Sequence, residues 1–140
     1  MKAKILSAGV VVVKKNTNGF NYLLLRAYNH WDFPKGVVEP GEEVLDGAKR
    51  EVKEETTITD LSFIWGYDYK ETGPYGQGKV ARYYIAETFQ ENVDLPINPE
   101  IGRAEHEEFR WVNYEEALTM VSPRVRSVLD WSQNILKYVD

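Results

Sequence analysis

The sequence contains no cysteine and only two histidines, His30 and His106. Without cysteine there is no disulfide, no thiolate metal site and no cysteine nucleophile. Two histidines also exclude a three-histidine zinc centre. Oxygen ligands are abundant by contrast, because 22 residues are Asp or Glu. Any metal ion that the chain binds is therefore expected to be Mg²⁺, with Mn²⁺ as the alternative.

An excess of positive charge and a long apolar run are also missing. The net charge is −5, so a duplex nucleic acid is not expected as a partner, because that binding mode needs a basic face. The longest apolar run, Ala8–Val13, is far too short to span a bilayer, and no cleavage site of a signal peptide follows it. We expect one cytoplasmic domain over residues 1–140 that does not bind a membrane.

Periodicity and turn residues predict an alternation of strands and helices. Strands are expected at 3–14, 20–27, 60–71, 79–90 and 109–112, and helices at 43–56, after Asn113 and after Ser122. Asn18–Gly19 is typical of a hairpin turn, and Asn113 with Glu116 of a helix capping box. The segments 29–43 and 91–104 are expected to be loops. This order predicts an α+β fold in which helices pack on a mixed sheet.

Three glutamates on one side of the predicted helix 43–56 indicate chemistry. Glu51, Glu54 and Glu55 stand at positions i, i+3 and i+4, so their side chains share a face. Gly47 falls one turn earlier in the same sector, where we expect open space beside the acids. Like charges about 5 Å apart repel by roughly 3 kcal/mol at an effective dielectric of 20, which a divalent cation would offset. The alternative is that these glutamates form the solvated side of an amphipathic helix.

Together with the loop before it, this helix resembles the Nudix signature. The signature is Gly, five residues, Glu, seven residues, then Arg-Glu-aliphatic-x-Glu-Glu-x-Gly-aliphatic. The matching positions are Gly36, Glu42, Arg50, Glu51, Val52, Glu54, Glu55 and Ile58. Thr57 replaces the glycine that ends the helix in a left-handed conformation, which threonine adopts at a cost. We expect this exception to be structural. The resemblance implies an α/β/α sandwich with a mixed sheet between helices.

The resemblance further implies a Mg²⁺-dependent hydrolase that cleaves a phosphoanhydride bond. The implied metal ligands are the Gly36 carbonyl oxygen and the side chains of Glu51, Glu54, Glu55 and Glu105. Glu54 or Glu105 would accept a proton from the attacking water. Glu42 and Arg50 would form an ion pair that holds the loop against the helix. The alternative for Glu105 is one acid among several in the segment EHEE.

Segments around the signature resemble asymmetrical diadenosine tetraphosphate hydrolases, in which Pro-Lys-Gly opens the box as in HWDFPKGVVEPGEE. The substrate-binding residues that this resemblance implies are His30, Lys35, Tyr75, Lys79 and Tyr83. The two lysines would contact phosphate, Tyr83 would stack on adenine, and the products would be ATP and AMP. The alternatives are an exposed loop position for His30 and Lys35, and core packing for the two tyrosines.

Two other enzyme classes share the box, namely RNA 5′-pyrophosphohydrolases and hydrolases of nucleoside diphosphates linked to another group. A catalytically silent nucleotide-binding regulatory module is a further alternative. Such modules usually lose box glutamates, whereas all four are retained here. We therefore expect an enzyme whose partner is a small nucleotide.

Overall fold

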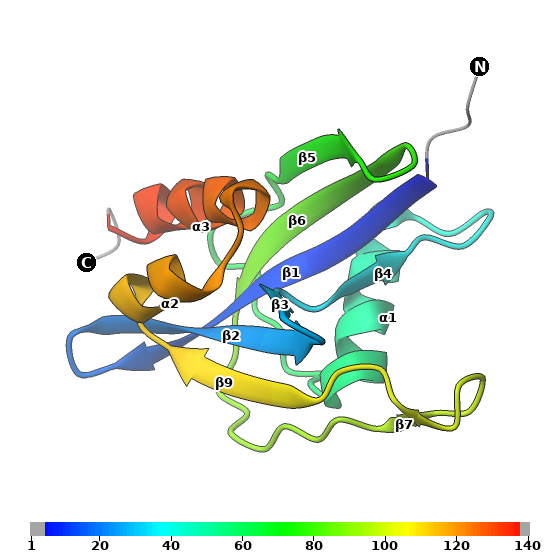
Figure 1. Ribbon diagram of the computed structural model, residues 1–140. Coiled ribbons are helices and arrows are strands. Elements are labelled where there is room, and N and C mark those ends of the chain that lie inside the picture. Colours follow the sequence, from blue (N-terminus) through cyan, green and yellow to red (C-terminus); the bar gives the residue numbers. More distant parts are fainter. Residues whose placement is uncertain (1–4, 138–140) are drawn as a thin grey trace.

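The computed structural model describes residues 5–137 and has three layers, with a sheet between helices (Figure 1). The strands are β1 (Ile5–Asn16), β2 (Gly19–Ala27), β3 (His30–Asp32), β4 (Lys35–Val37), β5 (Lys70–Tyr75), β6 (Lys79–Glu87), β7 (Ile97–Asn98), β8 (Arg103–Ala104) and β9 (Glu108–Val112). The helices are α1 (Val44–Thr56), α2 (Tyr114–Met120) and α3 (Pro123–Leu136). The predicted α+β fold and its sandwich architecture are confirmed.

The main sheet is mixed and has the order β3-β2-β1-β6-β5, with β4 paired to β1 and β9 paired to β2. Strands β1 and β6 are parallel, and the other pairs in this sheet are antiparallel. The pairing of β4 with β1 places Gly36 opposite Ala8 and fixes the backbone of the Pro-Lys-Gly segment. Strands β7 and β8 form a separate two-stranded hairpin.

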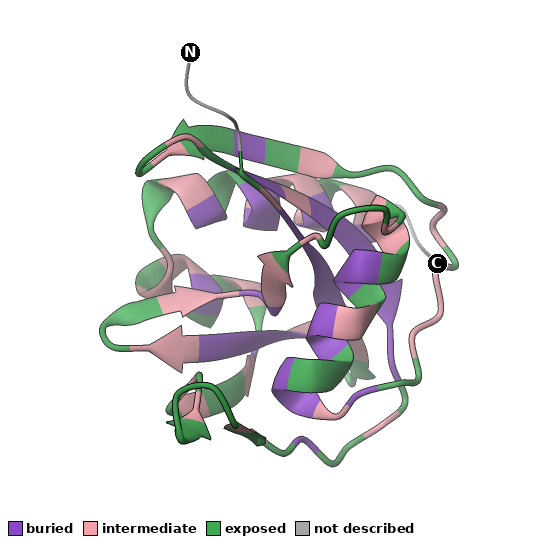
Figure 2. Cartoon of the chain, turned by 90° about the vertical axis from the view of Figure 1, so that its right-hand side faces the viewer, coloured by how far each residue is buried: buried purple, intermediate pink, exposed green. Residues whose placement is uncertain are grey.

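Strand β1 is buried on both faces because helices cover both sides of the sheet. Val10 and Val12 pack with Val52 of α1, whereas Val11 and Val13 pack with Leu129 of α3. Successive side chains of a strand point to opposite faces, so the continuous valine run supplies both cores. Figure 2 shows the buried residues along the central strands and on the helix faces turned toward them.

The predicted hairpin is present, although its turn lies one residue earlier than expected. Asn16 pairs with Gly19, which leaves Thr17 and Asn18 as the two turn residues. Residues 3 and 4 of the predicted first strand lie outside the described residues. Within residues 5–137, no helix is long and apolar enough to cross a membrane.

The helix boundaries agree with the capping signals. α2 has the predicted capping box, in which Asn113 Oδ1 accepts from Glu116 N at 2.9 Å and Glu116 Oε1 accepts from Asn113 N at 3.4 Å. Ser122 caps α3, whose first residue is Pro123. Thr57 ends α1 with φ at +67°, so the left-handed conformation expected at this position is present with threonine in it.

The predicted strand 60–71 is wrong. Its place in the sheet is taken by β5 at Lys70–Tyr75, and Ser62 forms only an isolated bridge with Glu87. Leu61 and Phe63 pack on the α1 side of the sheet, whereas Trp65 packs on the α3 side. Side chains two residues apart on a strand point to the same face, so these three residues do not belong to one strand of the sheet. The two predicted loops also contain short strands, which are β3 and β4 in the first and β7 and β8 in the second.

Candidate active site

A cleft of about 940 Å³ lies between α1, β4, the turn joining β5 and β6, and the β7–β8 hairpin. Most of the residues singled out in the sequence line it. They are Lys35, Gly36, Glu51, Glu54, Glu55, Tyr75, Lys79 and Glu105. Acidic side chains come mainly from α1, and the lysines come from the two strands β4 and β6. The cleft therefore has acidic and basic groups within reach of one ligand.

Strand β4 and helix α1 are in unusually close contact at the acidic side of the cleft. A Cβ atom on Gly36 would lie 2.0 Å from Glu51 Oε2, so only glycine leaves room for this carboxylate. One residue earlier, the backbone N–H of Lys35 donates to Glu55 Oε1 at 3.1 Å. Glu51 and Glu55 are both buried, whereas Glu54 is exposed. The loop and the helix thus present their carboxylates and backbone groups to the same space.

Arg50 connects the loop to the helix through several charge-assisted hydrogen bonds. Its Nε and Nη2 atoms donate to Glu42 at 2.8 and 3.1 Å, and Nη2 also donates to the Val37 carbonyl at 3.0 Å. The bidentate Glu42–Arg50 ion pair is present as the sequence predicted. Nη1 in addition contacts Glu51 at 2.8 Å and Glu54 at 3.1 Å, which the sequence did not indicate.

The space beside Gly47 is not open, which corrects the expectation from the helical wheel. A Cβ atom at this position would lie 2.9 Å from Glu42 Oε1. The glycine therefore lets the Glu42 carboxylate lie close to the surface of α1. This position supports the Glu42–Arg50 pair and leaves no room for a ligand.

Two of the buried carboxyl groups are poorly compensated by positive charge. Burial raises the pKa of Glu55 well above its usual range, and repulsion from Glu105 and Glu51 raises it further. Burial also raises the pKa of Glu51, although its contact with Arg50 opposes the shift. A divalent cation in this part of the cleft would relieve both the burial penalty and the repulsion. The carboxylate oxygens are also the ligand type that Mg²⁺ prefers.

The acidic side chains of the cleft do not converge on one point. Within residues 5–137, no three Asp, Glu or His side chains converge as a ready metal site. The reason lies in the contacts of Arg50, which draws the carboxylates of Glu51 and Glu54 toward itself. Rotation of these side chains away from Arg50 would free their oxygens. The donor set fits Mg²⁺ in chemistry, and the fit requires this rearrangement.

Glu105 follows β8 and lies close enough to Glu51 and Glu55 to raise the pKa of both. It lines the cleft and is exposed. In the described part of the chain it makes no hydrogen bond or ion pair. The resemblance implied a metal ligand at this position, with one acid among several as the alternative, and the structure brings Glu105 together with Glu51 and Glu55.

The basic and aromatic side of the cleft contains Lys35, Lys79 and Tyr75. Lys35 Nζ lies 3.9 Å from Asp32 Oδ2, which is a weak contact, and Lys79 is exposed. The ring of Tyr75 is half-buried, and its buried hydroxyl has no hydrogen-bond partner within residues 5–137. These three side chains are therefore available to a ligand in the cleft.

The prediction that Tyr83 stacks on adenine is wrong. Tyr83 is fully buried, and its ring lies 5.9 Å from that of Phe33. Its hydroxyl donates to Asp32 and accepts from Arg124 at 3.0 Å, and burial raises the pKa of this hydroxyl well above its usual range. No face of the ring is open to a base. Core packing, the alternative interpretation, is what the structure shows.

His30 is exposed on the edge strand β3 and does not line the cleft among the residues described here. The other histidine, His106, lies nearer to the site. Burial lowers its pKa, and its electrostatic interactions with Asp32 and Lys35 place it beside the Pro-Lys-Gly segment. The sequence reasoning missed His106, although its position next to Glu105 was a usable signal.

Residues 4–132 match the NUDIX domain family. This chain belongs to the Nudix family. It is 32% identical over 120 residues to the asymmetrical bis(5′-nucleosyl)-tetraphosphatase of Caenorhabditis elegans, which covers 81% of this chain and 83% of the relative. The mouse protein of the same name is 34% identical over 113 residues, with 76% and 74% covered. With these relatives and the retained box, the chain is a Nudix hydrolase that acts on acid anhydrides of phosphorus.

Solved structures agree with this assignment. A crystal structure of a C. elegans Ap4A hydrolase binary complex has a TM-score of 0.81 and 28% identity, with 96% of this chain and 99% of that chain covered. A curated RNA pyrophosphohydrolase of Bartonella henselae is also similar, at 27% identity over 110 residues, covering 69% of this chain and 64% of the relative. The sequence and structure comparisons therefore both show the Nudix fold, and the relatives include asymmetrical tetraphosphatases and an RNA pyrophosphohydrolase.

Proposed function

We propose that this Nudix hydrolase is Mg²⁺-dependent and cleaves diadenosine tetraphosphate into ATP and AMP. The observation that carries the proposal is the cleft itself. It joins poorly compensated carboxylates on α1 to two lysines and one accessible tyrosine. A polyphosphate chain needs positive charge along its length, and a nucleoside needs an aromatic face.

The residues that would hold Mg²⁺ are Glu51, Glu54, Glu55, Glu105 and the carbonyl of Gly36. When bound, the ion supplies positive charge that stabilises the phosphoryl oxygens in the transition state. Lys35 and Lys79 add positive charge along the polyphosphate, and Tyr75 offers its ring to an adenine. The Glu42–Arg50 pair keeps the loop of Lys35 and Gly36 against α1, so that these groups are positioned before the substrate binds.

Water attacks one phosphorus, the adjacent anhydride bond to oxygen breaks, and the water loses a proton. Glu54 and Glu105 are the two candidates for accepting this proton. Glu54 is held by Arg50 at 3.1 Å, whereas Glu105 makes no ion pair in the described residues. A general base must come within hydrogen-bond reach of the water that it deprotonates. These contacts favour Glu105 as the base and Glu54 as a ligand.

The second candidate function is the removal of pyrophosphate from 5′-triphosphorylated RNA. The similarity to the RNA pyrophosphohydrolase of B. henselae favours it. Hydrolysis of a nucleoside diphosphate linked to another group is a third possibility that the same box would serve. A silent regulatory module is disfavoured, because the box glutamates are retained and three of them, Glu51, Glu54 and Glu55, line one cleft.

A substrate panel tests the proposal. The purified protein is incubated with Mg²⁺ and diadenosine tetraphosphate, triphosphorylated RNA or ADP-ribose, and the products are separated by anion-exchange chromatography. We expect equal amounts of ATP and AMP, and the highest kcat/KM on diadenosine tetraphosphate. Equal kcat/KM on ADP-ribose, or faster release of pyrophosphate from RNA, would reject the substrate and leave the family assignment intact.

A further inference from the structure

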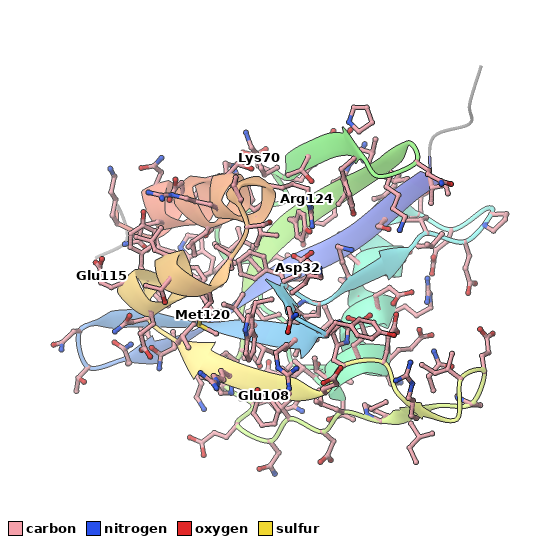
Figure 3. All side chains as sticks on the ribbon, viewed as in Figure 1. Asp32, Lys70, Glu108, Glu115, Met120 and Arg124 are labelled. Carbon is pink, nitrogen blue, oxygen red and sulfur yellow. The ribbon has the colours of Figure 1, made fainter. Side chains whose placement is uncertain are left out.

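Arg124 stands at the start of α3, in a part of the chain for which the sequence gave no functional signal. It connects three elements of the fold through its guanidinium group. Nη2 donates to Asp32 Oδ2 at 2.7 Å, and Nη1 donates to Thr72 Oγ1 at 2.8 Å and to the Tyr83 hydroxyl at 3.0 Å. Figure 3 labels Asp32, on β3, and Arg124, at the start of α3. The guanidinium group is thus held in a fixed orientation.

Asp32 lies near a second cation, which belongs to the cleft. Lys35 Nζ is 3.9 Å from Asp32 Oδ2, compared with 2.7 Å for Arg124 Nη2. The short contact satisfies the carboxylate, so Lys35 is not needed to neutralise it. If Arg124 lost its charge, Lys35 would be the nearest cation to Asp32 in the described residues. Its ammonium group would then be drawn out of the cleft toward the carboxylate.

The same guanidinium group also supports the aromatic side of the cleft. Arg124 Cζ lies 4.1 Å from the centroid of the Tyr75 ring, which is the geometry of a cation–π contact. Tyr75 lines the cleft and has no hydrogen bond from its hydroxyl within residues 5–137. The stacked guanidinium therefore helps to hold the plane of this ring, which also packs against the α3-side core.

We propose that Arg124 is a positioning residue for substrate binding. It neutralises Asp32 so that Lys35 remains available to a phosphate, and it holds the Tyr75 ring in place for a base. The inference rests on the proposed function, because Lys35 and Tyr75 act here as substrate contacts. Arg124 itself is not among the residues that line the cleft.

The first experiment replaces Arg124 with Gln and measures kcat and KM on diadenosine tetraphosphate with Mg²⁺. We expect kcat/KM to fall roughly tenfold or more, with a lower kcat from the displaced Lys35 and a higher KM from the loosened Tyr75 ring. Arg126→Gln is the matched control, because Arg126 is an exposed arginine on the same helix. Its kcat and KM should equal those of the unchanged protein.

Rescue separates positioning from a general loss of structure. In the Arg124→Gln background, Asp32→Asn removes the charge that would capture Lys35 while retaining an oxygen for the Tyr83 hydroxyl. We expect this double variant to recover kcat to within about twofold of the unchanged protein, whereas KM stays raised. In a Lys35→Met background, Arg124→Gln should leave kcat without further loss. If Arg124 had a merely structural role, Asp32→Asn would not restore kcat, and Arg124→Gln would lower kcat further in the Lys35→Met background.

Arg124→Lys covers the case in which the glutamine variant does not fold. Lysine keeps a positive charge beside Asp32 but cannot stack on Tyr75 as a planar group. We expect kcat within about twofold of the unchanged value and a KM raised severalfold. A kcat in Arg124→Gln equal to that of Arg126→Gln, or failure of Asp32→Asn to restore it, would overturn the inference.

The failure of the proposed function can be told apart from the failure of this inference. If the unchanged protein prefers another substrate of the panel, the same variants are measured on that substrate, and the rescue of kcat by Asp32→Asn is still expected. If no substrate is turned over, the Kd of ATP is measured by titration calorimetry. We expect weaker binding in Arg124→Gln and partial recovery in the double variant. If the effects of Arg124→Gln and Asp32→Asn were additive in either measurement, the role of Arg124 would be rejected.

Discussion

Two acidic groups, Asp32 and Glu55, both lie near Lys35, and the protein compensates their charges differently. On one side, Asp32 accepts hydrogen bonds from the guanidinium of Arg124, the hydroxyl of Tyr83 and the backbone N–H of Phe33. Lys35 lies near it as a second cation. This carboxylate is satisfied within the protein and needs no ligand.

On the other side, Glu55 has a different environment. Within residues 5–137 it accepts one hydrogen bond, from the backbone N–H of Lys35. The carboxylates of Glu51 and Glu105 lie beside it, and burial together with this repulsion raises its pKa well above the usual range. A buried acid whose pKa stays raised although Lys35 lies nearby indicates where a cation binds from outside. Asp32 thus has a structural role, whereas Glu55 is suited to bind a metal ion.

The largest effect is expected from the glutamates of α1. Glu54→Gln and Glu55→Gln should each lower kcat roughly a hundredfold or more, because each removes a charged oxygen ligand from the metal site. Chelation of divalent cations by EDTA should abolish turnover. Glu115→Gln, at an exposed position on α2, is the matched control and should retain full activity. Near-full activity in EDTA, or in both box variants, would remove the basis for the metal assignment.

Substitutions on the aromatic side of the cleft should mainly change substrate binding. Stacking of one base on an aromatic ring is worth roughly 1–3 kcal/mol, so Tyr75→Ala should raise KM for diadenosine tetraphosphate about ten- to hundredfold with little change in kcat. Tyr83→Phe keeps the buried ring and should leave KM within about threefold of the unchanged value. Steady-state kinetics on both variants check this order. A larger rise of KM in Tyr83→Phe than in Tyr75→Ala would contradict the assignment.

Stability of the metal-free protein provides a further test of the comparison. The folded-state pKa of Glu55 lies above its ordinary value, so ionisation of this group opposes folding. Stability is expected to fall as pH rises from the ordinary range of a glutamate through the raised value. Glu55→Gln should therefore unfold at a higher temperature than the unchanged protein at pH 7 in EDTA, and this advantage should vanish near pH 4. A lower Tm of the variant at pH 7 would show that the charge is compensated after all.

The smallest effect concerns Thr57, which lies at the end of α1 and outside the cleft. Its φ of +67° costs less for glycine than for a β-branched residue. Thr57→Gly should stabilise the protein by a few tenths to about 1 kcal/mol and leave kcat unchanged, as measured by urea unfolding and kinetics. Thr57→Ala is the control and should gain less, because it retains a Cβ atom. A large loss of activity in Thr57→Gly would reveal a role of the hydroxyl.

The sequence sufficed for features whose partners are close along the chain. The helix with Glu51, Glu54 and Glu55 follows from spacing within one turn, and the pair of Glu42 with Arg50 follows from the resemblance to the Nudix signature. The caps at Asn113 and Ser122 are also local, because a side chain there reaches backbone groups two or three residues away.

Features that depend on contacts between distant segments were missed or misjudged. Arg124 and Asp32 are 92 residues apart, and no local pattern connects them. Tyr83 occupies a strand position whose side chain points into the α3-side core, and its contacts with Phe33 and Arg124 join segments that are distant in the sequence. The strand predicted at 60–71 failed for the same reason, since its aromatic residues pack on two sides of the sheet.

The most direct test of the account is Mn²⁺ binding followed by electron paramagnetic resonance, with Mn²⁺ in place of Mg²⁺. The unchanged protein, Glu55→Gln and Asp32→Asn are titrated in parallel, because the two substitutions neutralise acids near Lys35 whose charges the protein compensates differently. The account predicts that Glu55→Gln weakens Mn²⁺ binding at least tenfold, whereas Asp32→Asn binds Mn²⁺ like the unchanged protein. Undiminished Mn²⁺ binding in Glu55→Gln, or loss of Mn²⁺ binding in Asp32→Asn, would contradict the claim that Glu55 and the glutamates beside it hold the metal ion.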